Sequence, residues 1–299
     1  MNETNPTIHG RTLDYPVEKF PTWTRRTLFT DYGVERARAF TFEFYPITEH
    51  RSLFSFLSIP RETQFNRHYS YLWTNEAESV SIVESGRGEL WIGHDHKKYT
   101  LTPGVAFYLP RTPEVRATAY LSNISKRGEP LRITSLQLPS DEQSDKANPA
   151  VIVDPSTLDW KIFEYETLGR EVLAAPNKRM GLLQLAFPME KIPLHTHPYS
   201  DRFIRTISGH GFVYIDPYKY EMGEDDAFIA FPRNVVHTNG PKPREKFVIW
   251  SFHFPWIDPE IDEENIAGSE AYAKYLQAPP KPLWKTKAEL LSALERKIL

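Results

Sequence analysis

Three histidines in the second half of the chain have the residue type and spacing of a metal site. His195 and His197 are two residues apart, so on a β-strand, where side chains alternate between faces, both imidazoles point to the same side. His237 follows 40 residues later, and a later strand can return it to the pair. Imidazole binds zinc, iron, nickel and copper, and three such ligands leave coordination positions open for water and substrate. The pattern therefore predicts a mononuclear metal centre suited to catalysis.

Turn residues lie at fixed distances from these histidines. Gly209 and Gly211 form a glycine turn after the pair, and the stretch from Pro232 to His237 reads PRNVVH. In order and spacing, the two stretches resemble the double motif of the cupin superfamily: H-x-H followed by a glutamate and a glycine, and later P-x-G followed by a histidine. The resemblance implies a barrel of the double-stranded β-helix (jelly-roll) type. Asn234 stands where that motif usually has glycine.

The chain departs from the motif at its carboxylate ligand. Arg202 occupies the place of the glutamate, and Asp201 lies one residue earlier. A guanidinium has no lone pair to give to a metal and carries positive charge, so it cannot replace a carboxylate there. In one reading, the three histidines bind the metal alone and Arg202 points inward, where it binds an anionic group of the substrate. In the other, the strand is shifted by one residue, so that Asp201 is a fourth ligand and Arg202 extends to solvent.

Asp201 has two further interpretations. It can hydrogen-bond a ligand histidine, or it can be a turn former whose side chain bonds only the backbone. We take both Asp201 and Arg202 as candidate catalytic residues beside the three histidine ligands. Gln184 and His253 lie on strands expected to face the barrel interior and are candidate pocket residues.

Composition favours an all-β fold and excludes several classes of partner. The chain has 299 residues, enough for about two domains, and its 25 prolines, 15 tyrosines and 18 phenylalanines favour short strands and turns. The formal net charge of -3 gives no electrostatic reason to expect nucleic acid or an anionic membrane as partner. The chain has no cysteine, and no apolar run approaches the ~18 residues of a membrane helix. We expect a soluble cytoplasmic protein.

Two stretches of the chain recur in the same order. The sequence SVSIVESGRGELWI at 79–92 parallels RFIRTISGHGFVYI at 202–215, and VAFYLPR at 105–111 parallels AFIAFPR at 227–233. Such a repeat indicates two copies of one fold unit, so the chain resembles a bicupin. We predict an N-terminal arm at 1–35, a first cupin lobe at 36–144, a second lobe with the metal site at 145–258, and a tail at 259–299 that ends in a short amphipathic helix.

The metal motif fails in the first copy. The positions equivalent to the three histidines are Leu72, Thr74 and Val115, so we expect no metal in the first lobe. His94 and His96 form another His-x-His pair there, but the surrounding GHDHKK has the composition of a hairpin turn. These two histidines are predicted to be solvated.

The resemblance implies a metal-dependent enzyme that acts on a small polar or anionic organic substrate. The three histidines resemble the metal site of ring-cleaving and diketone-cleaving cupin dioxygenases, so we expect a dioxygenase. The resemblance implies one iron(II) per chain, with manganese, nickel or zinc as other candidates. The alternatives are a cupin isomerase, decarboxylase or lyase, in which the metal polarises a carbonyl, and a non-catalytic small-molecule sensor. A homodimer is compatible with the resemblance.

Overall fold

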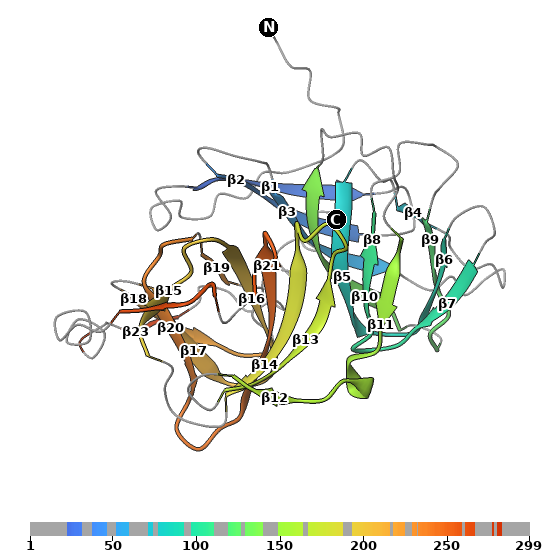
Figure 1. Cartoon of the computed structure of the whole chain (residues 1–299). Coiled ribbons are helices and arrows are strands. Elements are labelled where there is room, and N and C mark those ends of the chain that lie inside the picture. The colour runs from blue at the N-terminus through green and yellow to red at the C-terminus, as the bar shows by residue number, and fades with distance from the viewer. Residues whose placement is uncertain are drawn as a thin grey trace, which may run out of the picture. The chain divides into compact units, whose positions relative to one another are not determined.

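Figure 1 shows the computed structural model of the chain, in which the described elements are almost all β-strands. The structure describes residues 23–31, 38–46, 52–59, 71–73, 77–92, 97–110, 119–126, 129–139, 149–163, 167–187, 193–215, 218–224, 229–231, 233–258, 261–266, 277 and 280–282. In this part of the chain, no helix is long and apolar enough to cross a membrane. The expectation of an all-β fold is confirmed, whereas the helix predicted at 285–299 lies outside the described residues.

The chain divides into two compact units, Met1–Thr157 and Leu158–Leu299. The first unit has a seven-stranded sheet in the order β1-β2-β3-β10-β5-β8-β11 and a four-stranded sheet in the order β4-β9-β6-β7. Strand β2 contains the alternating sequence FTFEF, the period that predicts a strand with one apolar face. The bounds are β1 (Trp23–Asp31), β2 (Arg38–Pro46), β3 (Ser52–Ile59), β4 (Tyr71–Trp73), β5 (Ala77–Ser85), β6 (Gly88–Ile92), β7 (Lys97–Leu101), β8 (Ala106–Leu109), β9 (Ala119–Asn123), β10 (Leu131–Pro139) and β11 (Val151–Val153), followed by the 3-10 turn η2 (Pro155–Thr157).

The first unit extends beyond the limits predicted for the first lobe at both ends. Strand β1 lies in the stretch predicted as an arm, and it pairs with β2 along its whole length. Strand β11 lies beyond the predicted boundary at residue 145, yet it pairs with β8 of the first unit. The choice of partner strand depends on tertiary contacts that the local sequence does not encode.

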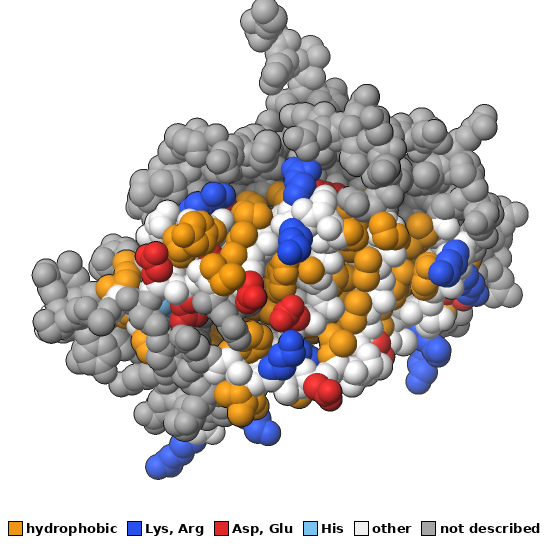
Figure 2. All heavy atoms as spheres, viewed as in Figure 1, with side chains coloured by type: hydrophobic (Ala, Val, Ile, Leu, Met, Phe, Trp, Pro, Cys, Tyr) orange, Lys and Arg blue, Asp and Glu red, His pale blue; other side chains and the backbone are white. Residues whose placement is uncertain are grey.

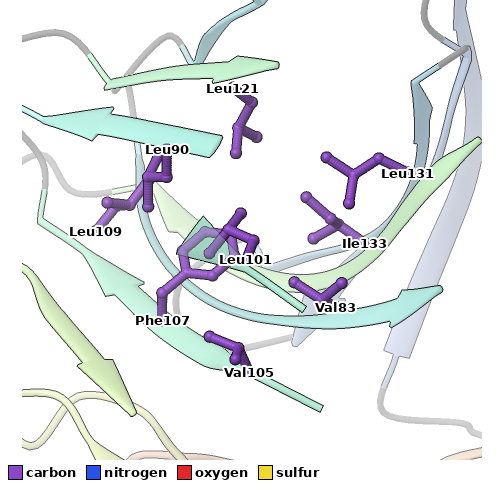
Figure 3. Packing of buried hydrophobic residues seen from close by; sticks show 9 residues of the cluster. All are labelled: Val83, Leu90, Leu101, Val105, Phe107, Leu109, Leu121, Leu131 and Ile133. Carbon is purple, nitrogen blue, oxygen red and sulfur yellow. The ribbon is translucent and has the colours of Figure 1, made fainter. Parts of the chain in front are cut away.

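An apolar cluster lies between the two sheets of the first unit. Figure 3 shows its nine side chains, which come from strands of both sheets and from the turn before β8 and point toward one another. None is more than 6% exposed. This part of the described interior is therefore apolar. The members are Val83, Leu90, Leu101, Val105, Phe107, Leu109, Leu121, Leu131 and Ile133.

The second unit has two six-stranded sheets, β12-β13-β14-β21-β16-β19 and β22-β15-β20-β17-β18-β23. The bounds are β12 (Lys161–Ile162), β13 (Leu168–Ala174), β14 (Gly181–Phe187), β15 (His195–Thr196), β16 (Asp201–Gly209), β17 (Gly211–Ile215), β18 (Tyr218–Met222), β19 (Ile229–Phe231), β20 (His237–Pro241), β21 (Phe247–Phe254), β22 (Glu264–Asn265) and β23 (Pro280–Pro282). Strands β22 and β23 come from the predicted tail and form the edges of the second sheet. These two described strands after residue 258 thus belong to the second unit.

The turn glycines of the internal repeat have the same backbone conformation in both units. Gly86 lies between β5 and β6 with φ 81°, and Gly209 is the last residue of β16 with φ 78°. A Cβ on Gly86 would lie 2.4 Å from the carbonyl oxygen of Pro130, and one on Gly209 would lie 1.7 Å from that of Lys246. Both positions therefore require glycine, because of the positive φ and the close approach of backbone.

Candidate metal centre

The structure brings the three predicted histidine ligands together. His195 is on β15, His197 follows that strand directly, and His237 begins β20, where it pairs with His195 across the sheet. The ring centroids of His195 and His237 are 4.3 Å apart, and those of His195 and His197 are 4.9 Å apart. One ligand atom from each ring lies within 4.8 Å of the others. Among the described residues, these three histidines form a group whose ligand atoms are close enough together to hold a metal ion.

Backbone carbonyls fix the orientation of all three rings. Nδ1 of His195 lies 2.8 Å from the carbonyl oxygen of Pro193, Nδ1 of His237 lies 2.8 Å from that of Val235, and Nδ1 of His197 lies 2.7 Å from that of Asp262. A carbonyl can only accept, so each Nδ1 carries the proton and donates it. The lone pair of each ring is then on Nε2. Orientation by a hydrogen bond on the far nitrogen is typical of metal-binding histidines.

Burial keeps these imidazoles neutral. Desolvation lowers the pKa of His195 to about 4, although the hydrogen bond to Pro193 opposes the shift. Desolvation also lowers the pKa of His197 and of His237 well below 6.5, and the nearby Arg202 cation lowers both pKa values further. Neutral imidazole is the form that binds a metal. The donor set therefore fits a divalent ion with nitrogen ligands.

Arg202 points inward, but it lies behind a ligand histidine. Its side chain is buried, and Nη2 lies 3.0 Å from Nδ1 of His197, on the side of the ring away from Nε2. Two partners thus compete for this Nδ1. The carbonyl of Asp262 is closer, at 2.7 Å, and matches the pattern of the other two rings, so we assign the hydrogen bond to it and regard the arginine as a packed cation. The predicted extension of Arg202 to solvent does not occur.

The guanidinium of Arg202 is held by polar residues around it. Nη2 donates to Oδ2 of Asp262 over 2.8 Å, Nε donates to Oγ of Ser200 over 3.0 Å, and Nη1 donates to Nε2 of His253 over 2.9 Å. His253 is fully buried, and burial lowers its pKa well below 6.5, so it accepts as a neutral ring. A role for Arg202 in direct substrate binding stays a prediction.

Asp262 is the residue that sequence reasoning missed. It lies 60 positions after Arg202 in the stretch predicted as a tail, and its side chain is completely buried. Its Oδ1 accepts the backbone N–H of Tyr199 over 2.9 Å, and its Oδ2 accepts hydrogen bonds from Ser200 and Arg202. A buried cation in the glutamate position requires a buried anion elsewhere, and this requirement is a signal that points to a missing carboxylate but not to its place in the chain.

Asp201 fixes the loop that leads to His237. Its Oδ1 accepts the backbone N–H of Arg233 over 2.7 Å, and its Oδ2 lies 3.1 Å from Nη2 of the same arginine. Asp201 does not belong to the described group that can hold a metal. It is on the face of β16 opposite to Arg202, because successive residues of a strand point to opposite sides. A catalytic role for Asp201 stays a prediction.

The two predicted pocket residues have different positions. His253 is directly opposite Arg202 in the pairing of β16 with β21, so both share the inner face. Gln184 is opposite Trp250, one residue out of phase with that face, and its Oε1 accepts a hydrogen bond from Nε of Arg170. Gln184 therefore does not face the histidine cluster. Whether Gln184 and His253 face the same side depends on the register in which β14 pairs with β21. The sequence does not supply that register.

The other predicted positions are less informative. Leu72 is on β4 of the first unit, whereas Thr74, Val115, His94 and His96 lie outside the described residues. Strands β6 and β7, which flank the second histidine pair, are paired from Gly88↔Leu101 to Ile92↔Lys97. The prediction that His94 and His96 are solvated is therefore untested.

Comparison with known proteins supports the fold assignment. No protein-family model and no curated protein matches the chain. Among solved structures, a cupin 2 conserved barrel domain protein from Leptotrichia buccalis has a TM-score of 0.50 at 13% identity and covers 75% of this chain and 91% of its own. AerE from Microcystis aeruginosa has a TM-score of 0.56 at 11% identity and covers 79% of this chain and 99% of its own.

A third solved structure matches nearly the whole chain. Oxalate decarboxylase from Lactobacillus farciminis, in complex with formate, has a TM-score of 0.54 at 8% identity and covers 93% of this chain and 96% of its own. At such identities the likeness concerns the fold. The chain is folded as a bicupin, with two cupin barrels in tandem, and its candidate site for a divalent metal lies in the second barrel.

Proposed function

We propose that the chain is a mononuclear metal enzyme whose metal is bound by His195, His197 and His237. The observation that carries the proposal is the set of three hydrogen bonds from Nδ1 to backbone carbonyls, which leaves three Nε2 lone pairs for one ion. Histidines that only fill space in a core do not need the same hydrogen bond from Nδ1 on three neighbouring rings. Three protein ligands leave positions for substrate, as in catalytic rather than structural sites.

Charge favours an anionic substrate. The three ligands are neutral, and the nearby cation of Arg202 is balanced by Asp262, so a divalent ion would keep its full charge. A site of this kind attracts a group such as a carboxylate or enolate that offers two oxygens to the metal. We therefore propose a small anionic organic substrate. Figure 2 shows that, on the face in view, described lysine, arginine, aspartate and glutamate side chains are interspersed, so this face has no single-sign patch for a polyanion.

We further propose that the reaction is a dioxygenation with iron(II). A bound ferrous ion would supply adjacent coordination positions for substrate and dioxygen together with the redox chemistry. Behind His197, buried Arg202 donates hydrogen bonds to Ser200 and to His253. Because Arg202 lies at Nδ1 of His197, we assign these residues to orientation of that ligand rather than to the proton transfer that an isomerase needs beside its substrate. This arrangement favours chemistry in which the metal and dioxygen do the bond breaking.

The experiment combines metal analysis with gas exchange. The chain, purified without a metal-binding tag or chelator, is reconstituted anaerobically with Fe²⁺ and mixed with 2,5-dihydroxybenzoate, acetylacetone or oxalate in an oxygen electrode. Uptake of dioxygen that depends on substrate and iron supports the dioxygenase. Release of CO₂ from oxalate without net dioxygen uptake would instead indicate a decarboxylase, the activity named for the L. farciminis structure. Binding of these compounds without turnover under any metal would indicate a sensor.

A further inference from the structure

Asp262 bonds the metal ligand His197 and three residues near it. Its backbone carbonyl accepts the proton on Nδ1 of His197, and its carboxylate accepts hydrogen bonds from the backbone of Tyr199, from Ser200 and from Arg202. The carboxylate is completely buried, so these bonds are shielded from water. Charge-assisted hydrogen bonds in such surroundings are stronger than those between neutral groups.

The segment that carries Asp262 pairs with a strand of the second unit. Of the described residues 258 and 261–266, Asp262 donates its backbone N–H to the carbonyl of Asp258. Strand β22 then pairs with β15, with Asn265 opposite His195. At the end of the segment, the N–H of Ile266 bonds the carbonyl of Leu194, and Ile266 packs against the apolar cluster that includes Leu194. Backbone pairing thus holds the segment beside both histidines of the His-x-His pair.

Electrostatics explains why an aspartate is required here. Burial disfavours the charged form of Arg202, and the nearby carboxylate of Asp262 opposes this effect. Removing one partner of a buried pair leaves an uncompensated charge, which is strongly destabilising. Without Asp262, the cation packed against His197 would have to move or lose its interactions, and the ring would move with it.

We propose that Asp262 is a positioning residue for the metal ligand His197, and that the segment 261–266 is part of the metal centre. Asp262 acts on the ring directly through its carbonyl and indirectly by holding Arg202 in the place of the glutamate ligand. The inference rests on the proposed function, since it requires that the three histidines bind a metal. It adds that metal binding and docking of the segment stabilise each other.

The test uses Co²⁺, whose visible absorption reports the geometry of its ligands, in the full chain and in Asp262→Asn. The variant keeps the backbone carbonyl and an oxygen for the N–H of Tyr199, but it loses the charge that holds Arg202. We expect Co²⁺ affinity to fall by roughly tenfold to a hundredfold, the effect typical of residues that orient a ligand, with a changed absorption spectrum. The control is Glu264→Gln, because Glu264 is exposed on the same segment. It should match wild type in both measurements.

A double variant separates positioning from simple instability. Arg202→Met combined with Asp262→Asn removes both buried charges, so its resistance to urea should recover towards that of wild type. The inference predicts that its Co²⁺ affinity and spectrum nevertheless stay altered. Recovery of both would overturn the inference, as would wild-type affinity in Asp262→Asn. If the wild-type chain binds no Co²⁺, the proposed function itself fails, and the inference fails with it.

Discussion

The backbone N–H of Asn234 donates a hydrogen bond to the backbone carbonyl of His197 over 2.9 Å, which connects the loop before one ligand to the segment that carries another. Asn234 has φ 63°, in the left-handed region. Glycine and asparagine adopt this conformation at the lowest cost. Asparagine in the place of the motif glycine is therefore a conformational equivalent, and the loop retains the shape that directs His237 toward the pair.

Substitution of Asn234 tests this conformational role. The residue is exposed, so Asn234→Val removes little packing but places a β-branched residue at positive φ. We expect the free energy of unfolding in urea to fall by about 1–2 kcal/mol. Asn234→Gly should stay within about 0.5 kcal/mol of wild type. Equal effects of the two substitutions would show that the asparagine side chain, rather than its backbone, stabilises the loop.

The metal prediction is one ion per chain. His195→Ala, His197→Ala and His237→Ala should each abolish tight binding, because two imidazoles do not provide a complete site. Elemental analysis after dialysis measures the occupancy. The matched control is His94→Ala with His96→Ala, which removes a His-x-His pair of the first unit and should leave occupancy unchanged. Two ions per chain in wild type would contradict the assignment to the second barrel.

Direct substrate binding by Arg202 and its positioning role make different kinetic predictions. If Arg202 contacts the substrate, Arg202→Ala and Arg202→Lys should lower kcat/KM by roughly tenfold or more, equivalent to at least ~1.4 kcal/mol, while metal content stays intact. If it only positions His197, the loss of activity should follow the loss of metal affinity and recover at saturating metal. Loss of metal in Asp201→Ala but not in Arg202→Ala would instead indicate that the metal site depends on Asp201, either as a ligand or through the loop that leads to His237.

The buried histidines make stability depend on pH in a defined direction. Burial lowers the pKa of His195 to about 4 and that of His253 well below 6.5, whereas both titrate near 6.5 when unfolded. Between these values the unfolded chain binds more protons, so lower pH favours unfolding. In the metal-free chain, these histidines should not change the free energy of unfolding above pH ~6.5. The free energy should fall as the pH drops from there to ~4.

Urea unfolding at several pH values provides the measurement. His253→Gln removes one buried titrating ring while keeping an acceptor for Arg202, so the dependence on pH should become shallower. His210→Gln removes an exposed histidine and is the control. A slope in His253→Gln as steep as in wild type would show that His253 does not contribute.

Much of the site could be predicted because it depends on spacing within one strand and its turns. His195 and His197 follow from the period of a strand, and the glycine and asparagine turns follow from backbone conformations that few residues adopt. Those signals are local. The His-x-His pair and the strand-rich composition belong to this class, whereas His237 and the internal repeat were found by comparing distant stretches of the sequence.

The rest depends on contacts between distant parts of the chain. The partner of β11 and the role of Asp262 are set by which segments meet in the folded state, and nothing in the sequence around Val151 or Asp262 specifies this. The inward direction of Arg202 is an intermediate case. Two registers of β16 were consistent with the sequence, and the choice between them is made by the buried ion pair with Asp262.

The hydrocarbon interior of the first unit has a consequence for the tolerance of the chain to mutation. Because Val83, Phe107 and Ile133 are held among other apolar side chains, a polar substitution there should act on folding, and compensating changes elsewhere that add stability should rescue it. A substitution at His195 should leave an intact fold that added stability cannot restore to activity. A library of random variants carried in a stabilised background would therefore recover losses in the first half of the chain and retain those at the histidines, which would map the chemistry without knowledge of the substrate.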